Sequence, residues 1–203
     1  MAELSDDYLK YPNRGHGMDH DRYPWSQLHE RPNVTWPNGA RVALWVVTQL
    51  QWFPMDMKPA VPVPGAMARP YPDFWNYTLR DYGNRVGVYR IFKVLDKLGL
   101  KSSVAINSAL AERHPFLIEQ VNQRGWEVVA NGLDMGHIIH GEMDREEEAA
   151  MIKGVLDSLR KLSGQPVRGW LSPIRSESFN TPDIAAANGI EYLCDWLNDD
   201  MPY

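Results

Sequence analysis

The chain has 203 residues, 44% of them hydrophobic and 23% charged, which is the composition of a globular protein with one large or two small domains. Its 21 basic and 26 acidic residues give a net charge of -5 with no basic cluster, which excludes the electrostatic pattern of a nucleic-acid-binding protein. No apolar run approaches the roughly 20 residues that span a bilayer, and the N-terminus has no signal-like segment, so we expect a cytoplasmic protein. The single cysteine, Cys194, excludes an internal disulfide and a cysteine-based zinc ribbon.

Residues 1–40 hold no periodic segment but are dense in aromatic, proline and charged residues. This composition predicts an ordered arm that wraps the domain or serves as an oligomerisation extension, because disordered tails are usually poor in aromatics. Residues 41–203 then form the main domain. A turn is expected at residues 37–39, and the β-branched and aromatic run 41–49 predicts a first strand that is buried on both faces.

The proline-rich segment 52–82 predicts a long extended loop, and loops of this length usually cover a functional site. A helix is expected over residues 84–98, closed by Gly99. Strands are predicted over 101–107 and 127–131, with a helix over 114–125 between them. The apolar side chains of the helix at 84–98, most of them expected on one stripe, are Val88, Ile91, Phe92, Val94, Leu95 and Leu98.

The next helix has the strongest signals at its start. Asp144 can cap it, with Glu147 three residues later, and the acids at 146–148 favour the positive end of the helix dipole. A strand over 167–173, a short helix over 181–187 and a fifth strand over 191–196 follow. The apolar face expected on the helix after Asp144 consists of Met151, Ile152, Val155, Leu156, Leu159 and Leu162.

Strands that alternate with helices at this spacing predict an α/β fold with a parallel sheet. A closed (β/α) barrel takes about 250 residues and eight strands. With about five strands, we expect a barrel that is incomplete at the C-terminus, either part of a longer polypeptide or completed by another chain. An open five-stranded sheet is the alternative. Ligands bind beyond the carboxyl ends of parallel strands, where this chain carries Gln49, Gln51, Trp52, Asn107, Asn131, Asp134, His137, Ser172, Arg175, Glu177, Asp195, Asn198, Asp199 and Asp200.

Two of these polar residues are candidates for chemistry. Asn131 ends a buried strand, where its amide could donate to an oxyanion or hold a substrate carbonyl, although an Asn-Gly pair is also a common turn. Glu177 lies beyond another strand end beside Arg175, where a carboxylate can activate water. Its alternative role is that of a capping or surface acid.

Other groups at the strand ends have weaker signals. Trp52, Trp170 and Trp196 could stack on a flat substrate ring, and each could equally be core. Asp199 and Asp200 are adjacent, so at most one faces the site. A metal site would draw on the three weak candidates Asp134, His137 and His140, and the alternative is surface or hydrogen-bonded histidines.

Five ordered phrases of the sequence resemble a known superfamily. They are RPNVTWPNGARVALWVV, the stretch YPDFWNYTLRDYGNRVGVYRIFKVLDKLGLKSSVAIN, RGWEVVANG, RGWLSP and FNTPDIAAANGIEYLCDWLNDD. Together they resemble the polysaccharide deacetylase (NodB-homology) superfamily, in particular the branch with the cofactor-free allantoinase and related C–N hydrolases. The resemblance implies a distorted (β/α) barrel, hydrolysis of an acyl–nitrogen bond and a place in carbohydrate metabolism. Asp195 matches a late family motif that orients catalytic groups.

The chain departs from the family's metal motifs. No carboxylate follows the first strand in residues 48–52, residues 131–135 read NGLDM where the family has its histidine motif, and Leu171 stands where an arginine is expected beside the matching Pro173. We therefore expect no metal and no other cofactor. Zinc or another divalent metal held by His137 and His140 is the alternative.

The expected function is hydrolysis of a non-peptide carbon–nitrogen bond in a small amide, imide or N-acetyl substrate. Glu177 or Asp195 would position water, and Asn131 and Arg175 would bind the carbonyl side. The expected partners are the small-molecule substrate and either identical subunits or a second chain that completes the barrel. The alternative is a catalytically inactive member that acts as a binding or structural subunit. The substrate-binding candidates are Arg175, Trp52, Gln51, Trp170 and Asp199.

Overall fold

The computed structural model describes residues 28–55, 72 and 74–197, which fall into two compact units. The first unit is described over residues 28–43. This part contains the single-turn 3-10 helices η1 (Leu28–Glu30) and η2 (Pro37–Gly39) and no buried side chain. The turn expected at 37–39 is confirmed, because Ala40 N–H donates to the Pro37 carbonyl at 3.2 Å.

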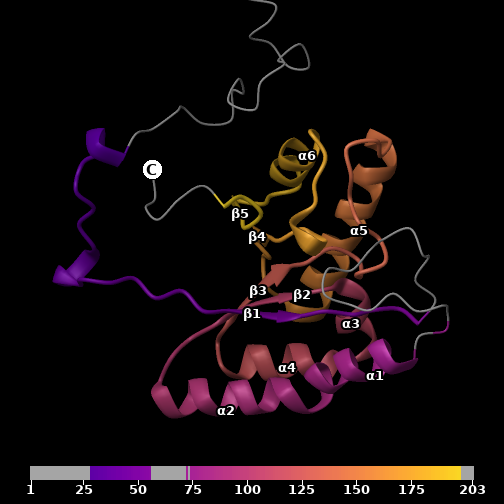
Figure 1. Ribbon diagram of the computed structural model, residues 1–203, viewed down its shortest axis with the longest axis horizontal. Helices are drawn as coiled ribbons and strands as arrows, with labels where there is room; N and C mark the ends of the chain where they lie inside the picture. The colour runs from indigo at the N-terminus through magenta and orange to yellow at the C-terminus, as the bar shows by residue number, and fades with distance from the viewer. Residues whose placement is uncertain (1–27, 56–71, 73, 198–203) are drawn as a thin grey trace, which may run out of the picture. The chain divides into compact units, whose positions relative to one another are not determined.

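The second unit, Leu44–Leu197, is built on one parallel sheet (Figure 1). Its strands follow the order β1-β2-β3-β4-β5, which is the sequential order of a (β/α) barrel and lacks the reversal of a doubly wound sheet. The sheet is not closed within the described residues, so the predicted fold, an incomplete (β/α) barrel, is confirmed. The strands are β1 (Val47–Leu50), β2 (Ser103–Ile106), β3 (Glu127–Ala130), β4 (Gly169–Trp170) and β5 (Tyr192–Leu193).

Helices connect the strands and cover the outer face of the sheet. Figure 1 shows α2 and α4 running along the same side of β1–β3, with α5 and α6 beside β4 and β5. None of the helices in the described ranges is long and apolar enough to cross a membrane. The helical elements are α1 (Phe74–Tyr82), the π-helical turn η3 (Gly83–Gly87), α2 (Val88–Leu98), α3 (Ser108–Arg113), α4 (Pro115–Gln123), α5 (Arg145–Ser163), the 3-10 turn η4 (Pro173–Arg175) and α6 (Thr181–Ala187).

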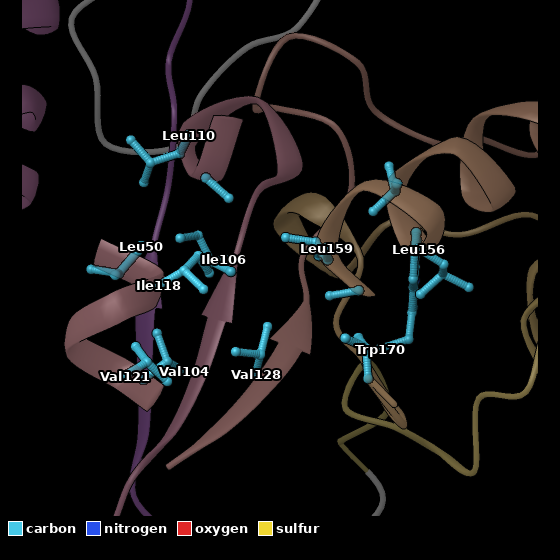
Figure 2. Close-up of a cluster of buried hydrophobic side chains, with 14 of the residues drawn as sticks. Leu50, Val104, Ile106, Leu110, Ile118, Val121, Val128, Leu156, Leu159 and Trp170 are labelled. Atoms are coloured by element: carbon cyan, nitrogen blue, oxygen red, sulfur yellow. The ribbon is translucent and has the colours of Figure 1, made fainter. Parts of the chain in front are cut away.

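Alternation along the strands divides the core into two clusters. The larger cluster joins the outward side chains of the strands to the helices, and Figure 2 shows Leu50, Ile106, Val128 and Trp170 among its members. Burying each Val, Leu or Ile side chain there stabilises the fold by about 1.5–3 kcal/mol. The smaller cluster lies on the opposite, inner face of the sheet and consists of Ala105, Val129 and Leu171, with Val47, Tyr192 and Cys194 packed against it.

Capping residues in the sequence correctly predicted where the later helices begin and end. Helix α6 has the expected bounds, and Asp144 caps α5 by accepting hydrogen bonds from the N–H groups of Glu146 and Glu147 at 2.9 and 3.1 Å. Gly99 and Gly164 end α2 and α5 in left-handed conformations, with φ of 64° and 68°.

Two predictions about the first half of the domain were wrong. The first strand begins at Val47 instead of Arg41, and Leu44 and Trp45 are exposed, because β2 offers β1 pairing positions only from Ser103 onward. The segment 52–82 also contains helix α1 over its last nine residues, whereas residues 56–71 lie outside the described part.

Only half of the apolar side chains named for the helix at 84–98 are buried, so most of them do not share one buried stripe. Val88, Phe92 and Leu95 are buried, but the other three predicted side chains, Ile91, Val94 and Leu98, are 47%, 55% and 61% exposed. Helix α2 has two apolar stripes, and only the one spaced i, i+4, i+7 meets the sheet.

Candidate active site

The carboxyl ends of β1, β2 and β3 are joined through Asn107, which is fully buried. Its Oδ1 accepts a hydrogen bond from the Trp52 N–H at 2.7 Å, and its Nδ2 donates to the Asn131 carbonyl. Both ends of this amide are therefore used to hold the backbone. Asn107 has a structural role that no local sequence signal indicated.

Asn131 follows β3, and its side chain is not used as that of Asn107 is. Its backbone N–H donates to the Ile106 carbonyl at 3.0 Å, and alternation with Val129 puts its side chain on the inner face of the sheet. The residue is fully buried, yet within the described structure neither Nδ2 nor Oδ1 has a hydrogen-bond partner. Because leaving such a group unsatisfied costs about 1–3 kcal/mol, this amide is a candidate for ligand binding.

Close packing brings the end of β3 against the end of β4. Gly132 has a φ of 64°, and a Cβ added there would lie 2.5 Å from Cγ of Pro173. The preceding Ser172 accepts a hydrogen bond from Trp170 Nε1 at 2.8 Å, and its N–H donates to Asp195 Oδ1 at 2.7 Å. The contacts therefore run without a break from the Asn131–Gly132 turn to Asp195 after β5.

Asp195 is a buried carboxyl group at the end of this series of contacts. Its Oδ2 atom has no hydrogen-bond partner among the described residues. Burial raises the pKa of Asp195, and the hydrogen bonds from Ser172 and the positive charge of Arg175 lower it only in part. The fold thus favours the neutral acid more than water does.

This shift in pKa predicts a pH dependence of stability. Because the folded-state pKa of Asp195 lies above its unfolded value, the native state keeps a proton that the unfolded state has lost, and stability falls as pH rises through this window. Asp195→Asn keeps an acceptor for the Ser172 N–H and removes the titration. We expect the variant's free energy of unfolding, relative to wild type, to rise as pH increases from about 3.9 through the folded-state pKa. Urea denaturation across pH tests this, and a constant difference between the two proteins would contradict it.

Glu177 lies in the loop after β4, where it meets the end of β5. Trp196 Nε1 donates a hydrogen bond to Glu177 Oε1, so two predicted site residues from different loops are in contact. The loop is held by Ser176 Oγ, which donates to the Ile139 carbonyl at 2.6 Å. Before it, Ile174 and the exposed Arg175 adopt φ values of 52° and 58°, a left-handed conformation that costs about 1–3 kcal/mol per residue.

The remaining predicted residues lie apart from this cluster. Gln51 Nε2 donates to Gln49 Oε1 at 3.2 Å, and the Trp52 ring packs edge-on against Tyr77 with the Arg113 guanidinium 5.0 Å from its centroid. Trp170 is completely buried in the larger core cluster. Asp199 lies outside the described residues.

The three metal candidates do not form a metal centre. Asp134 Oδ1 accepts hydrogen bonds from the N–H groups of Gly136 and His137 and contacts His137 Nδ1 at 2.8 Å, so the local turn occupies this oxygen. His140 is exposed. In the part of the chain that the structure describes, no three His, Cys, Asp or Glu side chains are gathered to hold a metal ion.

Comparisons with known proteins agree with this fold. The sequence profile of polysaccharide deacetylases matches residues 77–193. Puue allantoinase is similar in structure, with 26% identity and a TM-score of 0.70 over 89% of this chain and 63% of that chain. A probable polysaccharide deacetylase from Pseudomonas aeruginosa PAO1 has 24% identity and a TM-score of 0.70, covering 89% and 64%. A CE4 family pseudoenzyme from Bacillus anthracis has 12% identity and a TM-score of 0.54, covering 73% and 41%.

The last two similarities show a shared fold only. The chain spans less than two thirds of the length of each of these three proteins. No curated protein sequence matches the chain.

The expectation that the protein has no cofactor is wrong. Deacetylases of the matching family are metal-dependent, typically with zinc or cobalt. The family's metal-ligand residues are replaced at the motif positions of this chain, but such replacements do not by themselves show that a protein binds no metal. The described residues nevertheless do not fit the metal centre that the family implies, because Asp134 and His137 have no third ligand beside them.

The match covers more than half of the 203 residues, from within α1 to the end of β5. It contains four of the five strands and the whole series of contacts from Asn107 to Ser172. The chain therefore belongs to the polysaccharide deacetylase family.

Proposed function

We propose that the protein is a hydrolase that cleaves a carbon–nitrogen bond in an amide, imide or N-acetyl group. The observation that carries this proposal is the buried amide of Asn131, whose donor and acceptor both lack partners in the described structure at the carboxyl end of β3. Family membership supports the class of reaction. The contacts through Gly132, Pro173 and Ser172 support the inclusion of Asp195 in the same site.

The proposed roles follow from the chemistry of each group. Asn131 hydrogen-bonds the substrate's acyl–nitrogen group, and the exposed Arg175 at the end of β4 binds on the carbonyl side. Glu177 holds the attacking water and takes a proton from it. The water oxygen bonds to the carbonyl carbon, the C–N bond breaks, and the leaving nitrogen takes up a proton. Asp195 fixes the Ser172 backbone and so positions the end of β4.

Glu177→Gln tests the role of the proposed base. The substitution keeps the acceptor for Trp196 Nε1 but removes the proton acceptor, so kcat should fall about a hundredfold or more. The assay is mass-spectrometric detection of the hydrolysis products of an N-acetyl sugar, a linear amide and a cyclic imide, because opening of the imide ring adds one water without releasing an amine. Glu119→Gln on the exposed face of α4 is the matched control and should leave kcat unchanged. Unchanged activity of Glu177→Gln would remove this residue from the mechanism.

A second candidate function is a catalytically inactive subunit that completes a partner's barrel. One observation in its favour is that Asp134 and His137 have no third metal ligand among the described residues. Another is that β1 and β5, in the described part of the chain, each pair with a neighbouring strand on one side only. Co-purification followed by native mass spectrometry separates the two proposals. A stable second polypeptide of different mass supports the inactive subunit, whereas a homo-oligomer of a longer chain with turnover supports the enzyme.

A further inference from the structure

Helix α2 carries a row of exposed apolar side chains on the side that does not meet the sheet. Ile91, Val94 and Leu98, at spacings i, i+3 and i+7, lie on one face of the helix, and all three are exposed. Phe92 and Leu95, on the other apolar face, are buried in the larger core cluster. We call the three exposed residues the α2 stripe. A contiguous apolar row on a protein surface typically marks an interaction site.

The α2 stripe borders a pocket of about 220 Å³ beside β1. Thr48 and Leu50 of β1 line this pocket together with Val88 and Ile91 of α2. Because Ile91 belongs both to the pocket and to the stripe, the two form one continuous surface. A pocket beside an exposed apolar row can hold an anchoring side chain of a binding partner.

The strand beside this pocket has an uncovered edge. Within the described residues, β1 pairs with β2 on one side and with no strand on the other. Its sequence, VTQL, contains neither a charged residue nor a proline, which are the means by which natural proteins protect a free edge. An edge of this composition is normally covered by another segment. The uncovered strand therefore indicates, independently of the α2 stripe, that this side of the unit is an interface.

Positive charges follow one flank of the α2 stripe. Each of its residues is directly preceded by an exposed basic residue, namely Arg90, Lys93 and Lys97. Because each residue of a helix is turned by about 100° from the one before it, these three bases lie on the same flank. Asp96 is the one acid in α2 and lies opposite the stripe, where it accepts a hydrogen bond from Arg124 Nη2 at 2.9 Å. The flank is therefore cationic.

We propose that the α2 stripe and the pocket beside β1 bind an amphipathic helix of a second polypeptide that carries acidic residues along its apolar face. The apolar side chains of this helix pack on the stripe, one of them enters the pocket, and its carboxylates face the three bases. A second copy of this chain is a poor occupant, because α2 against α2 brings like charges together. The inference does not depend on the proposed hydrolysis, since none of the proposed catalytic groups lines this surface.

The probes are two labelled synthetic peptides of about 18 residues, long enough to form a helix on binding. Both carry the same leucine stripe, flanked by glutamates in one peptide and by lysines in the other. At low ionic strength, fluorescence anisotropy with the whole chain should show about tenfold tighter binding of the glutamate peptide, and salt should reduce the difference. The net charge of -5 favours the lysine peptide at non-specific sites, so the expected preference is opposite to the non-specific one. Equal affinities, or tighter binding of the lysine peptide, would overturn the proposal.

Lys97→Glu and Lys161→Glu are a matched pair of charge reversals. Both lysines are exposed in the last turn of a helix, in α2 and in α5 respectively. Lys97→Glu should reduce the preference for the glutamate peptide by about threefold or more, whereas Lys161→Glu should leave it unchanged. Equal effects of the two reversals would show that the preference reflects net charge and not the flank of α2.

Val94→Ser tests the apolar part of the surface without changing its charge. It should weaken binding of the glutamate peptide about tenfold, whereas Phe116→Ser, at an exposed apolar position of α4, should have little effect. Unchanged binding to a Val94→Ser protein with a wild-type circular dichroism spectrum would place the peptide elsewhere. Native mass spectrometry of the unmodified chain tests the alternative occupant. A monomer supports the proposal, and a dimer that Val94→Ser dissociates would assign the stripe to a second copy and overturn it.

Discussion

Replacing Glu148 by alanine is expected to lower the free energy of unfolding by about 3–5 kcal/mol, mainly by leaving two buried hydroxyl groups without an acceptor. Glu148 is in the first turn of α5 and is fully buried. Its carboxylate accepts hydrogen bonds from Ser178 Oγ at 2.6 Å and from Thr181 Oγ1 at 2.5 Å. These hydroxyls also organise the turn that begins α6, since Thr181 Oγ1 accepts from the Ser178 N–H at 2.8 Å. One carboxylate therefore ties α5 to the loop that carries Glu177.

Urea denaturation measures this effect, and an unchanged m-value would show that the denatured state is not altered. The control is Glu147→Ala, one residue earlier and exposed. It removes an equal charge near the helix N-terminus and should cost only about 0.3–1 kcal/mol. Similar losses in the two variants would mean that Glu148 acts through the helix dipole and not through the two hydroxyls.

Gly132→Ala should be the second strongly destabilising change, with a loss of about 3 kcal/mol from backbone strain and overlap combined. The residue has a φ of 64°, and the new Cβ would lie 2.5 and 2.7 Å from the Cγ and Cδ atoms of Pro173. Both positions are far inside van der Waals contact, and the proline ring cannot rotate away. Relief requires the end of β3 or the end of β4 to move.

Gly125→Ala isolates the backbone part of this loss. Gly125 has a φ of 62°, but a Cβ there would meet nothing within 4 Å, so only the left-handed conformation is penalised, by about 1–2 kcal/mol. Thermal and urea unfolding of the two variants give the difference due to Pro173. Equal losses in the two variants would show that the turn absorbs the methyl group.

Much of the architecture could be predicted because its signals are local. Apolar runs of strand length alternate with amphipathic helices, and the caps at Asp144, Gly99 and Gly164 are short-range contacts that a sequence records directly. The start of β1 could not be predicted, because the run at 41–46 has the propensity of a strand but β2 pairs with β1 only from Val47 and Ser103 onward. Helix α2 has two apolar stripes, and only the position of the sheet decides which one is buried.

For the candidate site, too, some features could be predicted from the sequence and others could not. The positions of Asn131, Arg175, Glu177 and Asp195 at strand ends could be predicted from the parallel sheet, because every carboxyl end reaches the same edge. Their partners could not be predicted, since the Trp196–Glu177 and Ser172–Asp195 hydrogen bonds join residues 19 and 23 positions apart. Trp170 was predicted as a possible wall of the site. Its side chain instead points to the outer face of the sheet and lies in the larger core cluster.

By itself, the sequence determined the order of the five strands, the parallel sheet and the edge where polar residues gather, because periodicity and capping act within a few residues. It did not indicate helices α1 and α3. Only the tertiary structure decided which polar groups are satisfied. Asn107 and Asn131 have the same side chain in similar sequence positions, and Glu147 and Glu148 are adjacent acids in one helical turn. Asn107 and Glu148 are buried and bond to segments from distant parts of the chain, so both have structural roles, whereas Asn131 and Glu147 do not. These contacts form only when the chain has folded.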